Sequence, residues 1–336
     1  MRSLLRSTVW FLASSLAAAQ GTEPPGAPVL SRTPPVATGQ SPTPAAASTK
    51  PFVLTPKDGA ALLVLTTDRL PGERLRFITC EAVLDGNNDF GVNQLKLESS
   101  KWLREGVAPD EVHSFTWTFE PGVELKFSAK PDADGVDLKY VVTNHTKKTL
   151  ERVLVHPCFQ SMGSPSFFPG TAAQAADDAS GRKARTGIRD YSALHERLFL
   201  WSEGEPFAFA TSQLAKQERH LAFLARGEKE IAWGWWQNDS RRFDEPWIAL
   251  QSKDKQKVLG LTFERAAWAS ANTGDGRACF HLFGTVGKLA PEARGEVTGR
   301  IWLVDGDLAA FAKRAAAAIG PTPAGGARGT GGKSKK

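Results

Sequence analysis

The sequence predicts an all-β protein: a large antiparallel β-sandwich or barrel followed by one short helix. Apolar and polar residues alternate through many short runs between residues 51 and 320. A period of two is the pattern of strands with one buried face. Glycine, proline and aspartate separate the runs, as turns between strands require. The runs are too numerous for a small immunoglobulin-like sandwich, so one large domain is indicated.

The clearest element is a hairpin over residues 122–144, GVELKFSAKPDADGVDLKYVVTN. Val123, Leu125 and Phe127 alternate with polar residues, the DADG segment turns the chain, and the alternation then resumes. This predicts two antiparallel strands with one buried and one solvated face. Further strands are expected at SFTWTFE, PFAFATS, HLAFLA, PWIALQS, KVLGLTFE and EVTGRIWLVDG.

The one clear helix is DLAAFAKRAAAAIG, residues 307–320. Asp307 provides an N-cap, and Gly320 and Pro321 end the helix.

The N-terminus has the pattern of a secretory signal peptide over residues 1–19. Arg2 and Arg6 precede a short apolar run, and three alanines follow at positions 17–19. The run is shorter than the ~20 residues that span a bilayer, and no other run approaches that length, so we expect no transmembrane segment. The predicted location is outside the cytoplasm, with the periplasm and secretion both open.

Both ends outside the 51–320 domain have the composition of disordered segments. Residues 20–50 form a linker rich in proline, alanine and threonine, and residues 321–336 form a basic tail. The whole chain carries +6; removing +2 of the signal peptide, +1 of the linker and +4 of the tail leaves −1 on the domain. A nucleic-acid partner is not expected, because such proteins carry positive charge on the folded surface.

Three cysteines, Cys80, Cys158 and Cys279, lie far apart without a C-x-x-C spacing. That pattern predicts no metal cluster, and nothing in the sequence calls for a cofactor. Export would permit a Cys158–Cys279 disulfide, and three buried free thiols are an equal alternative.

Tryptophan is concentrated in IAWGWWQNDSRRFDEPW, in a chain with ten tryptophans and two tyrosines. Aromatic faces flanked by amides, carboxylates and guanidinium groups suit sugar rings and their hydroxyls. By strand alternation Trp233 and Trp235 share one face and Trp236 takes the other, so ligand-binding and core roles both stay open. The polar residues of this segment are Gln237, Asn238, Asp239, Arg241 and Arg242.

Two further side chains are candidates for acid–base chemistry. His156 lies near the end of the apolar run VLVHPCFQ, and Glu264 follows the alternating strand LGLTF. A carboxylate at the end of a buried strand is costly unless it is paired or functional. Arg265 or Arg277 is the alternative, purely structural partner of Glu264.

The stretch GVDLKYVVTNHTKKTLERVLVHPCFQ resembles the central part of galactose mutarotases (aldose epimerases), with Val142 and Asn144 before the motif histidine, His156. The segment GLTFE, then Asn272, then KLAPEARGEVTGRIWLV is similar to the family's catalytic glutamate, nearby asparagine and last long strand. The resemblance covers roughly residues 120–160 and 255–305. It implies the β-supersandwich fold of that superfamily.

Carried over by motif, His156 would be the acid that protonates the sugar's ring oxygen and Glu264 the base at the anomeric hydroxyl. The two side chains are therefore predicted to converge in one cleft, with Trp235 or Trp236 along its wall. The expected partner is a mono- or polysaccharide. The predicted substrate-binding residues are Trp235, Trp236, Gln237, Asn238, Asp239, Arg242 and Asn272.

Departures from the family pattern keep other functions open. Residues 52–112 contain no histidine, and Cys158 and Gln160 replace the usual aromatic residue and asparagine of the histidine motif. A fold survives such losses more readily than an activity does. The alternatives are a non-catalytic sugar-binding module and an exported structural domain with core tryptophans. A polysaccharide lyase is a further one, and its candidate residues are Arg189, Tyr191 and His195.

Overall fold

The structure, a computed structural model, describes residues 50–56, 62–85, 112–119, 122–168, 193–215, 220–229, 236–273 and 278–319, and the backbone of 88–91. The predicted signal peptide, almost all of the predicted linker, the basic tail and Trp235 lie outside these residues.

Seventeen strands in the described ranges form two sheets. The nine-stranded sheet contains β1 (Val53–Pro56), β2 (Leu62–Thr66), β3 (Leu75–Asp85), β4 (Asn88–Gly91), β8 (Leu150–Gln160), β11 (His220–Ala225), β12 (Gln237–Phe243), β15 (Ala266–Asn272) and β16 (Cys279–Leu289). The eight-stranded sheet contains β5 (His113–Phe119), β6 (Val123–Pro131), β7 (Gly135–Asn144), β9 (Leu198–Ser202), β10 (Glu205–Ala208), β13 (Trp247–Gln251), β14 (Lys257–Phe263) and β17 (Arg294–Asp305). Helices α2 (Ala193–Arg197) and α3 (Leu308–Ile319) and a 3₁₀ turn (Phe209–Thr211) complete the set.

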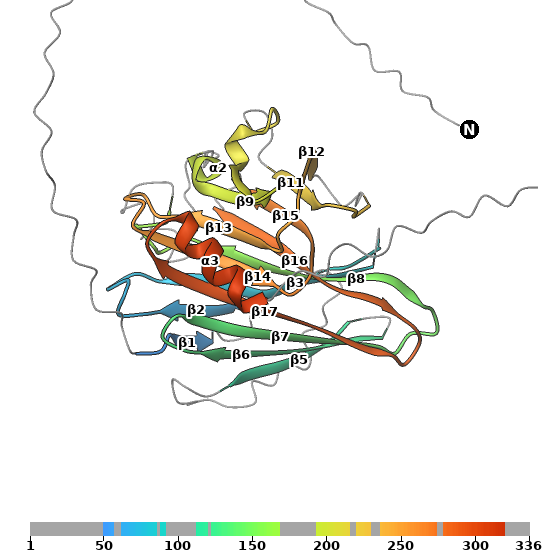
Figure 1. Ribbon diagram of the computed structural model, residues 1–336. Helices are drawn as coiled ribbons and strands as arrows, with labels where there is room; N and C mark the ends of the chain where they lie inside the picture. The colour runs from blue at the N-terminus through green and yellow to red at the C-terminus, as the bar shows by residue number, and fades with distance from the viewer. Residues whose placement is uncertain are drawn as a thin grey trace, which may run out of the picture. The chain divides into compact units, whose positions relative to one another are not determined.

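The strand order is β1-β2-β3-β8-β16-β15-β11-β12 in one sheet, with β4 on β3, and β10-β9-β13-β14-β17-β7-β6-β5 in the other (Figure 1). Neighbours are antiparallel except β11 and β12, which run parallel. The predicted all-β sandwich with a short C-terminal helix is confirmed.

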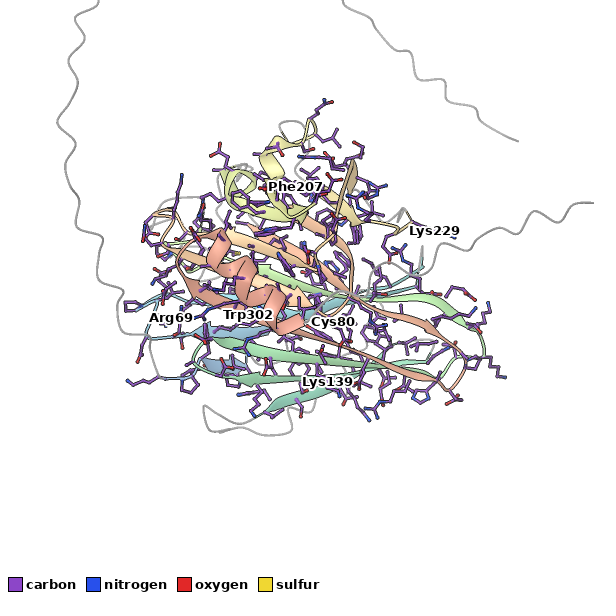
Figure 2. All side chains as sticks on the ribbon, viewed as in Figure 1. Arg69, Cys80, Lys139, Phe207, Lys229 and Trp302 are labelled. Carbon is purple, nitrogen blue, oxygen red and sulfur yellow. The ribbon has the colours of Figure 1, made fainter. Side chains whose placement is uncertain are left out.

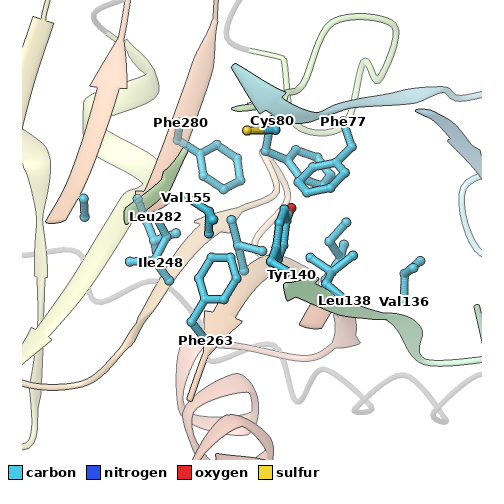
Figure 3. Close-up of a cluster of buried hydrophobic side chains, with 14 of the residues drawn as sticks. Phe77, Cys80, Val136, Leu138, Tyr140, Val155, Ile248, Phe263, Phe280 and Leu282 are labelled. Carbon is cyan, nitrogen blue, oxygen red and sulfur yellow. The ribbon is translucent and has the colours of Figure 1, made fainter. Parts of the chain in front are cut away.

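The core lies between the two sheets and is rich in aromatic rings. Tyr140 of β7 lies 4.9 Å from Phe127 and 5.8 Å from Phe263, measured between ring centroids. Its hydroxyl donates a 2.8 Å hydrogen bond to the carbonyl of Thr79 in β3, which joins the sheets through their centre. Figure 3 shows Tyr140 between Phe263 and Phe77, with Cys80 close to its hydroxyl.

The predicted hairpin is β6 and β7, with alternating burial along β6 and Val123 paired with Asn144. The segment PFAFATS differs from the prediction. Its strand ends at Ala208 and a 3₁₀ turn follows from Phe209 to Thr211. Phe209 is buried and its ring packs against that of Phe223 in β11.

Helix α3 covers the side of the eight-stranded sheet that faces away from the core. Asp307 caps it, since its Oδ1 accepts a 2.9 Å hydrogen bond from the amide of Ala310. Phe311 packs against Trp201 and lies in one apolar cluster with Trp302, which Figure 2 shows beside the helix. Gly260 of β14 leaves the space that the Phe311 ring occupies. No helix in the described ranges is long and apolar enough to cross a membrane.

Candidate functional site

The nine-stranded sheet has a second buried face, which we call the outer face because it points away from the core. In β8, Val155 and Phe159 belong to the core, whereas Leu154 belongs to the second apolar cluster. Successive side chains of a strand point to opposite faces, so His156 and Cys158 lie on the outer face with Leu154. The apolar cluster of this face comprises Ala82, Leu84, Leu154, Ala222, Leu224, Ala267, Trp268 and Phe283, with Trp236 against it.

A carboxylate lies between two imidazoles on the outer face. Glu81 Oε2 of β3 is 3.5 Å from His156 Nε2 of β8 and 3.8 Å from His281 Nε2 of β16. The two imidazole centroids are 4.7 Å apart, and His156 stacks on Phe283 at 4.3 Å. Both histidines are buried, while the Glu81 side chain is 22% exposed. Glu81 is therefore the member of this group that solvent reaches.

An irregularity in β3 places Glu81 at this position. Ile78 pairs with Cys158, and Ala82 pairs with His156. Between these two pairs β3 therefore contains two more residues than β8. Such bulges redirect side chains and are frequent next to active sites. Cys80 remains in the core, and the following residue, Glu81, points to the outer face.

The two imidazoles have opposite pKa shifts. Burial, and then the neighbouring His281, lower the pKa of His156 well below its usual value. Burial also opposes protonation of His281, but Cys279 and then Glu81 raise the pKa of that imidazole above its usual value. His281 is further held by Ser270, whose Oγ lies 3.1 Å from Nδ1. At neutral pH the group therefore contains a neutral His156.

An aromatic group borders the imidazoles. Trp236 contacts His281 and His220 edge-on, each at 5.4 Å between centroids, and Trp268 at 6.1 Å. Trp268 is fully buried, whereas Trp236 is partly exposed. Of the predicted tryptophans, Trp236 thus borders the candidate site, while Trp247 packs against Trp201 on the other sheet.

Polar groups continue along the same face. Asn272 is buried and pairs with His220 on one side and Cys279 on the other. Asn238 follows Trp236 by two residues, and its Oδ1 is buried without a hydrogen-bond partner within the described part of the chain. Asn272 and Asn238 therefore share the outer face with His156.

The remaining polar residues of the tryptophan-rich segment differ in role. Gln237 is exposed. The Asp239 carboxylate is buried and accepts hydrogen bonds from the Ser212 hydroxyl and the Arg241 amide. Arg242 Nη1 donates to backbone carbonyls of its own strand, including that of Asp239 at 3.1 Å. The Asp239 carboxylate thus ties β12 to Ser212, whereas the hydrogen bonds of Arg242 stay within the strand.

The structure does not bring His156 and Glu264 together. Glu264 follows β14, where Leu261 and Phe263 face the core, so its side chain points out of the eight-stranded sheet. Its carboxylate accepts a 3.1 Å hydrogen bond from Thr298 and lies 3.7 Å from Arg265. The core therefore separates Glu264 from His156, and the acid–base pair implied by the resemblance is not assembled.

Glu264 instead borders a shallow surface hollow of about 490 Å³ on the eight-stranded sheet. Lys139 and Arg300 also line it, and the lining in the described ranges includes no histidine. The alternative predicted for Glu264, a structural partnership with Arg265, matches its surroundings.

The cysteines lie in two places. Cys80 is buried in the core and its thiol donates to the Ala82 carbonyl at 3.1 Å. Cys158 and Cys279 lie on neighbouring strands of the outer face as buried thiols that are not joined in a disulfide. Burial, and then contact with Cys279, raise the pKa of Cys158 well above its usual value.

Sequence reasoning missed Glu81. The available signal was a carboxylate inside the otherwise apolar and neutral run FITCEAVL, where its burial must be compensated. His281 also lies in an alternating run, CFHLF, and its ring contacts that of His156 at 4.7 Å between centroids. Of the lyase candidates, His195 is buried beside Phe209, and Arg189 and Tyr191 lie outside the described residues.

No family model and no curated protein matches this chain. Similar solved structures include galactose mutarotase-like proteins from Clostridium acetobutylicum (12% identity, TM-score 0.40, covering 77% of this chain and 94% of that chain) and Lactobacillus casei (9%, 0.37, 75% and 100%). Another is an α-N-acetylgalactosaminidase from Bifidobacterium bifidum (12%, 0.43, 82% and 38%). The chain is thus similar to galactose mutarotase-like structures, the group that its sequence motifs resemble.

Proposed function

We propose that this protein binds a sugar on the outer face of the nine-stranded sheet and that Glu81 transfers a proton at the anomeric centre. The observation that carries the proposal is the partly exposed Glu81 carboxylate, which lies 3.5 Å from His156 and 3.8 Å from His281. His281 in turn contacts the partly exposed ring of Trp236. A carboxylate beside an aromatic face is the combination that a reacting sugar ring requires.

The neighbouring amides support sugar binding. The buried Oδ1 of Asn238 has no donor within the described ranges, and a sugar hydroxyl would satisfy it. Asn272 adds a second amide on the same face. Export through the predicted signal peptide, to the periplasm or the medium, would place such a protein among polysaccharides and their fragments.

Glu81 takes the role that the resemblance gave to Glu264. As a carboxylate it accepts the proton of the anomeric hydroxyl on one oxygen, while the bond between C1 and the ring oxygen breaks and C1 becomes a carbonyl. As a carboxylic acid it returns a proton to the ring oxygen, and reclosure on either face completes anomer exchange. His156 stays neutral and serves as a hydrogen-bonding neighbour of Glu81, in place of the acid role predicted for it.

A non-catalytic sugar-binding module is the second candidate. Its support is the burial of His156, which is 1% exposed and whose lowered pKa makes it a poor proton donor at neutral pH. In that case Trp236 and the amides would bind a sugar without exchanging its anomers.

The test is NMR exchange spectroscopy of anomer interconversion with the full chain and a panel of aldoses and uronic acids. Glu81→Gln should abolish the acceleration, whereas Glu264→Gln, a matched change on the opposite sheet, should leave it unchanged. Saturation-transfer NMR on the same samples reports binding. Binding without acceleration would support the module, and loss of exchange in Glu264→Gln alone would contradict the assignment of Glu81.

A further inference from the structure

A second cluster on the outer face has the donor atoms of a metal site. Single donor atoms of Cys158, Cys279 and His281 all lie within 4.8 Å of one another, and all three residues are buried. They come from β8 and β16, which are adjacent strands in the middle of the sheet. Donors on two paired central strands are held more firmly than donors on loops.

The spacing of the donors allows a tetrahedral ion. Zn²⁺ binds thiolate sulfur at about 2.3 Å and imidazole nitrogen at about 2.0–2.1 Å. Ligands at those lengths and tetrahedral angles lie roughly 3.5–3.8 Å from one another, inside the 4.8 Å limit that the three donors meet. Two sulfurs and one imidazole also favour Zn²⁺ over hard cations such as Mg²⁺ or Ca²⁺.

The surroundings orient the ligands as metal sites do. Ser270 Oγ holds His281 Nδ1 at 3.1 Å and so leaves Nε2 for a ligand bond. A hydrogen bond to the second ring nitrogen is the usual support of a metal-binding histidine. Gln160 Nε2 lies 3.6 Å from Cys158 Sγ and can donate to a thiolate. Glu81 Oε2 is 3.8 Å from His281 Nε2, so a carboxylate lies beside the imidazole.

We infer that Cys158, Cys279 and His281 form a binding site for a thiophilic divalent cation of the Zn²⁺ class, with Ser270 positioning the imidazole. The inference goes beyond the expectation, drawn from cysteine spacing alone, of no metal cluster. Cys158 and Cys279 are 121 positions apart in the sequence, and the pairing of β8 with β16 brings them together. The inference does not depend on the proposed sugar chemistry.

The test titrates the full-length, reduced protein with Co²⁺ and then displaces the ion with Zn²⁺. One equivalent should give the intense visible bands of tetrahedral Co²⁺ and a thiolate charge-transfer band, and Zn²⁺ should remove both. Cys158→Ser and Cys279→Ser should each abolish the charge-transfer change or weaken binding at least about tenfold. Cys80→Ala is the matched control, because its thiol lies in the core, and it should bind normally.

Ser270→Ala keeps all three ligands and should weaken Co²⁺ binding by about 10–100-fold. Circular dichroism confirms the fold of each variant, so a folding defect is separated from ligand loss. Absence of tetrahedral bands in the reduced wild-type chain would overturn the inference. So would a Cys158–Cys279 disulfide whose reduction restores no binding, or equal loss in Cys80→Ala. None of these readouts uses a sugar, so failure here and failure of the proposed function are distinguishable.

Discussion

At the scale of single residues, the position of Glu81 depends on a hydrogen bond across the core. The irregular part of β3 that redirects Glu81 also contains Thr79, whose carbonyl accepts the Tyr140 hydroxyl at 2.8 Å. Burial, and then Cys80, raise the pKa of Tyr140 well above its usual value, so the phenol stays a donor at all ordinary pH. The core therefore helps to fix the candidate site on the opposite side of the sheet.

Tyr140→Phe should lower the free energy of unfolding by about 1–3 kcal/mol, because the buried Thr79 carbonyl loses its donor while the ring remains. Urea denaturation measures this. Hydrogen exchange at the amides of residues 79–82 should accelerate more than exchange in the β6–β7 hairpin. An unchanged unfolding free energy together with uniform exchange would contradict the proposed support.

The sequence could predict that His156 lies on a strand with apolar neighbours, but not which carboxylate it meets. Alternation along β14 orients Glu264 away from the core residues Leu261 and Phe263. It carries no information on which sheet β14 joins, and that membership separates Glu264 from His156. Glu81 was missed because two extra residues in β3 are visible only against its partner β8.

At the scale of elements, local patterns determined what could be predicted. The β6–β7 hairpin and α3 follow from alternation, a turn and a cap within a few residues of one another. Strand β12 was not predictable as a strand, because QNDSRRF has no apolar alternation and pairs in parallel with β11. Its formation depends on a neighbour supplied by the rest of the fold.

The docking of α3 gives a test at this scale. A Cβ added at Gly260 would overlap the ring of Phe311, so Gly260→Ala should cost about 1–3 kcal/mol through overpacking. Phe311→Ala should cost about 3–5 kcal/mol through the cavity that it leaves. In the double variant the new methyl group enters the vacated space, so the loss should fall short of the sum by about 0.5–3 kcal/mol. Thermal and urea denaturation measure the cycle, and strict additivity would contradict this packing.

At the scale of the whole molecule, the two sheets carry different chemistry on the sides that face away from the core. The nine-stranded sheet gathers thiols, imidazoles and a carboxylate, all but Glu81 buried. The eight-stranded sheet carries ion pairs between residues that are far apart in the sequence. Arg300 of β17 binds Asp132 in the β6–β7 turn at 2.6 and 2.7 Å, and Asp305 pairs with Lys257 and Arg69 at 2.6 and 2.9 Å.

These ion pairs make the stability of the fold depend on pH in the acid range. Partial burial opposes ionisation, but Arg300 holds the pKa of Asp132 below its ordinary 3.8, and Lys257 and Arg69 do the same for Asp305. A depressed carboxyl pKa adds stability that is present above 3.8 and is lost as the pH falls through the lower, folded-state value. These two carboxylates should therefore make the urea midpoint fall below about pH 4. This loss adds to a decline that begins near pH 6.5, because the unfolded chain protonates His156 there and the folded chain does not. Asp132→Asn should lower the free energy of unfolding by less than about 1 kcal/mol at neutral pH, because the carboxylate is 49% exposed. It should also flatten the acid limb, the part of the urea-midpoint curve below about pH 4.

Asp68→Asn is the matched control, because Asp68 and Lys50 form a pair that is exposed on both sides, and it should leave that limb unchanged. An acid limb that is identical in Asp132→Asn and the wild type would contradict the assignment.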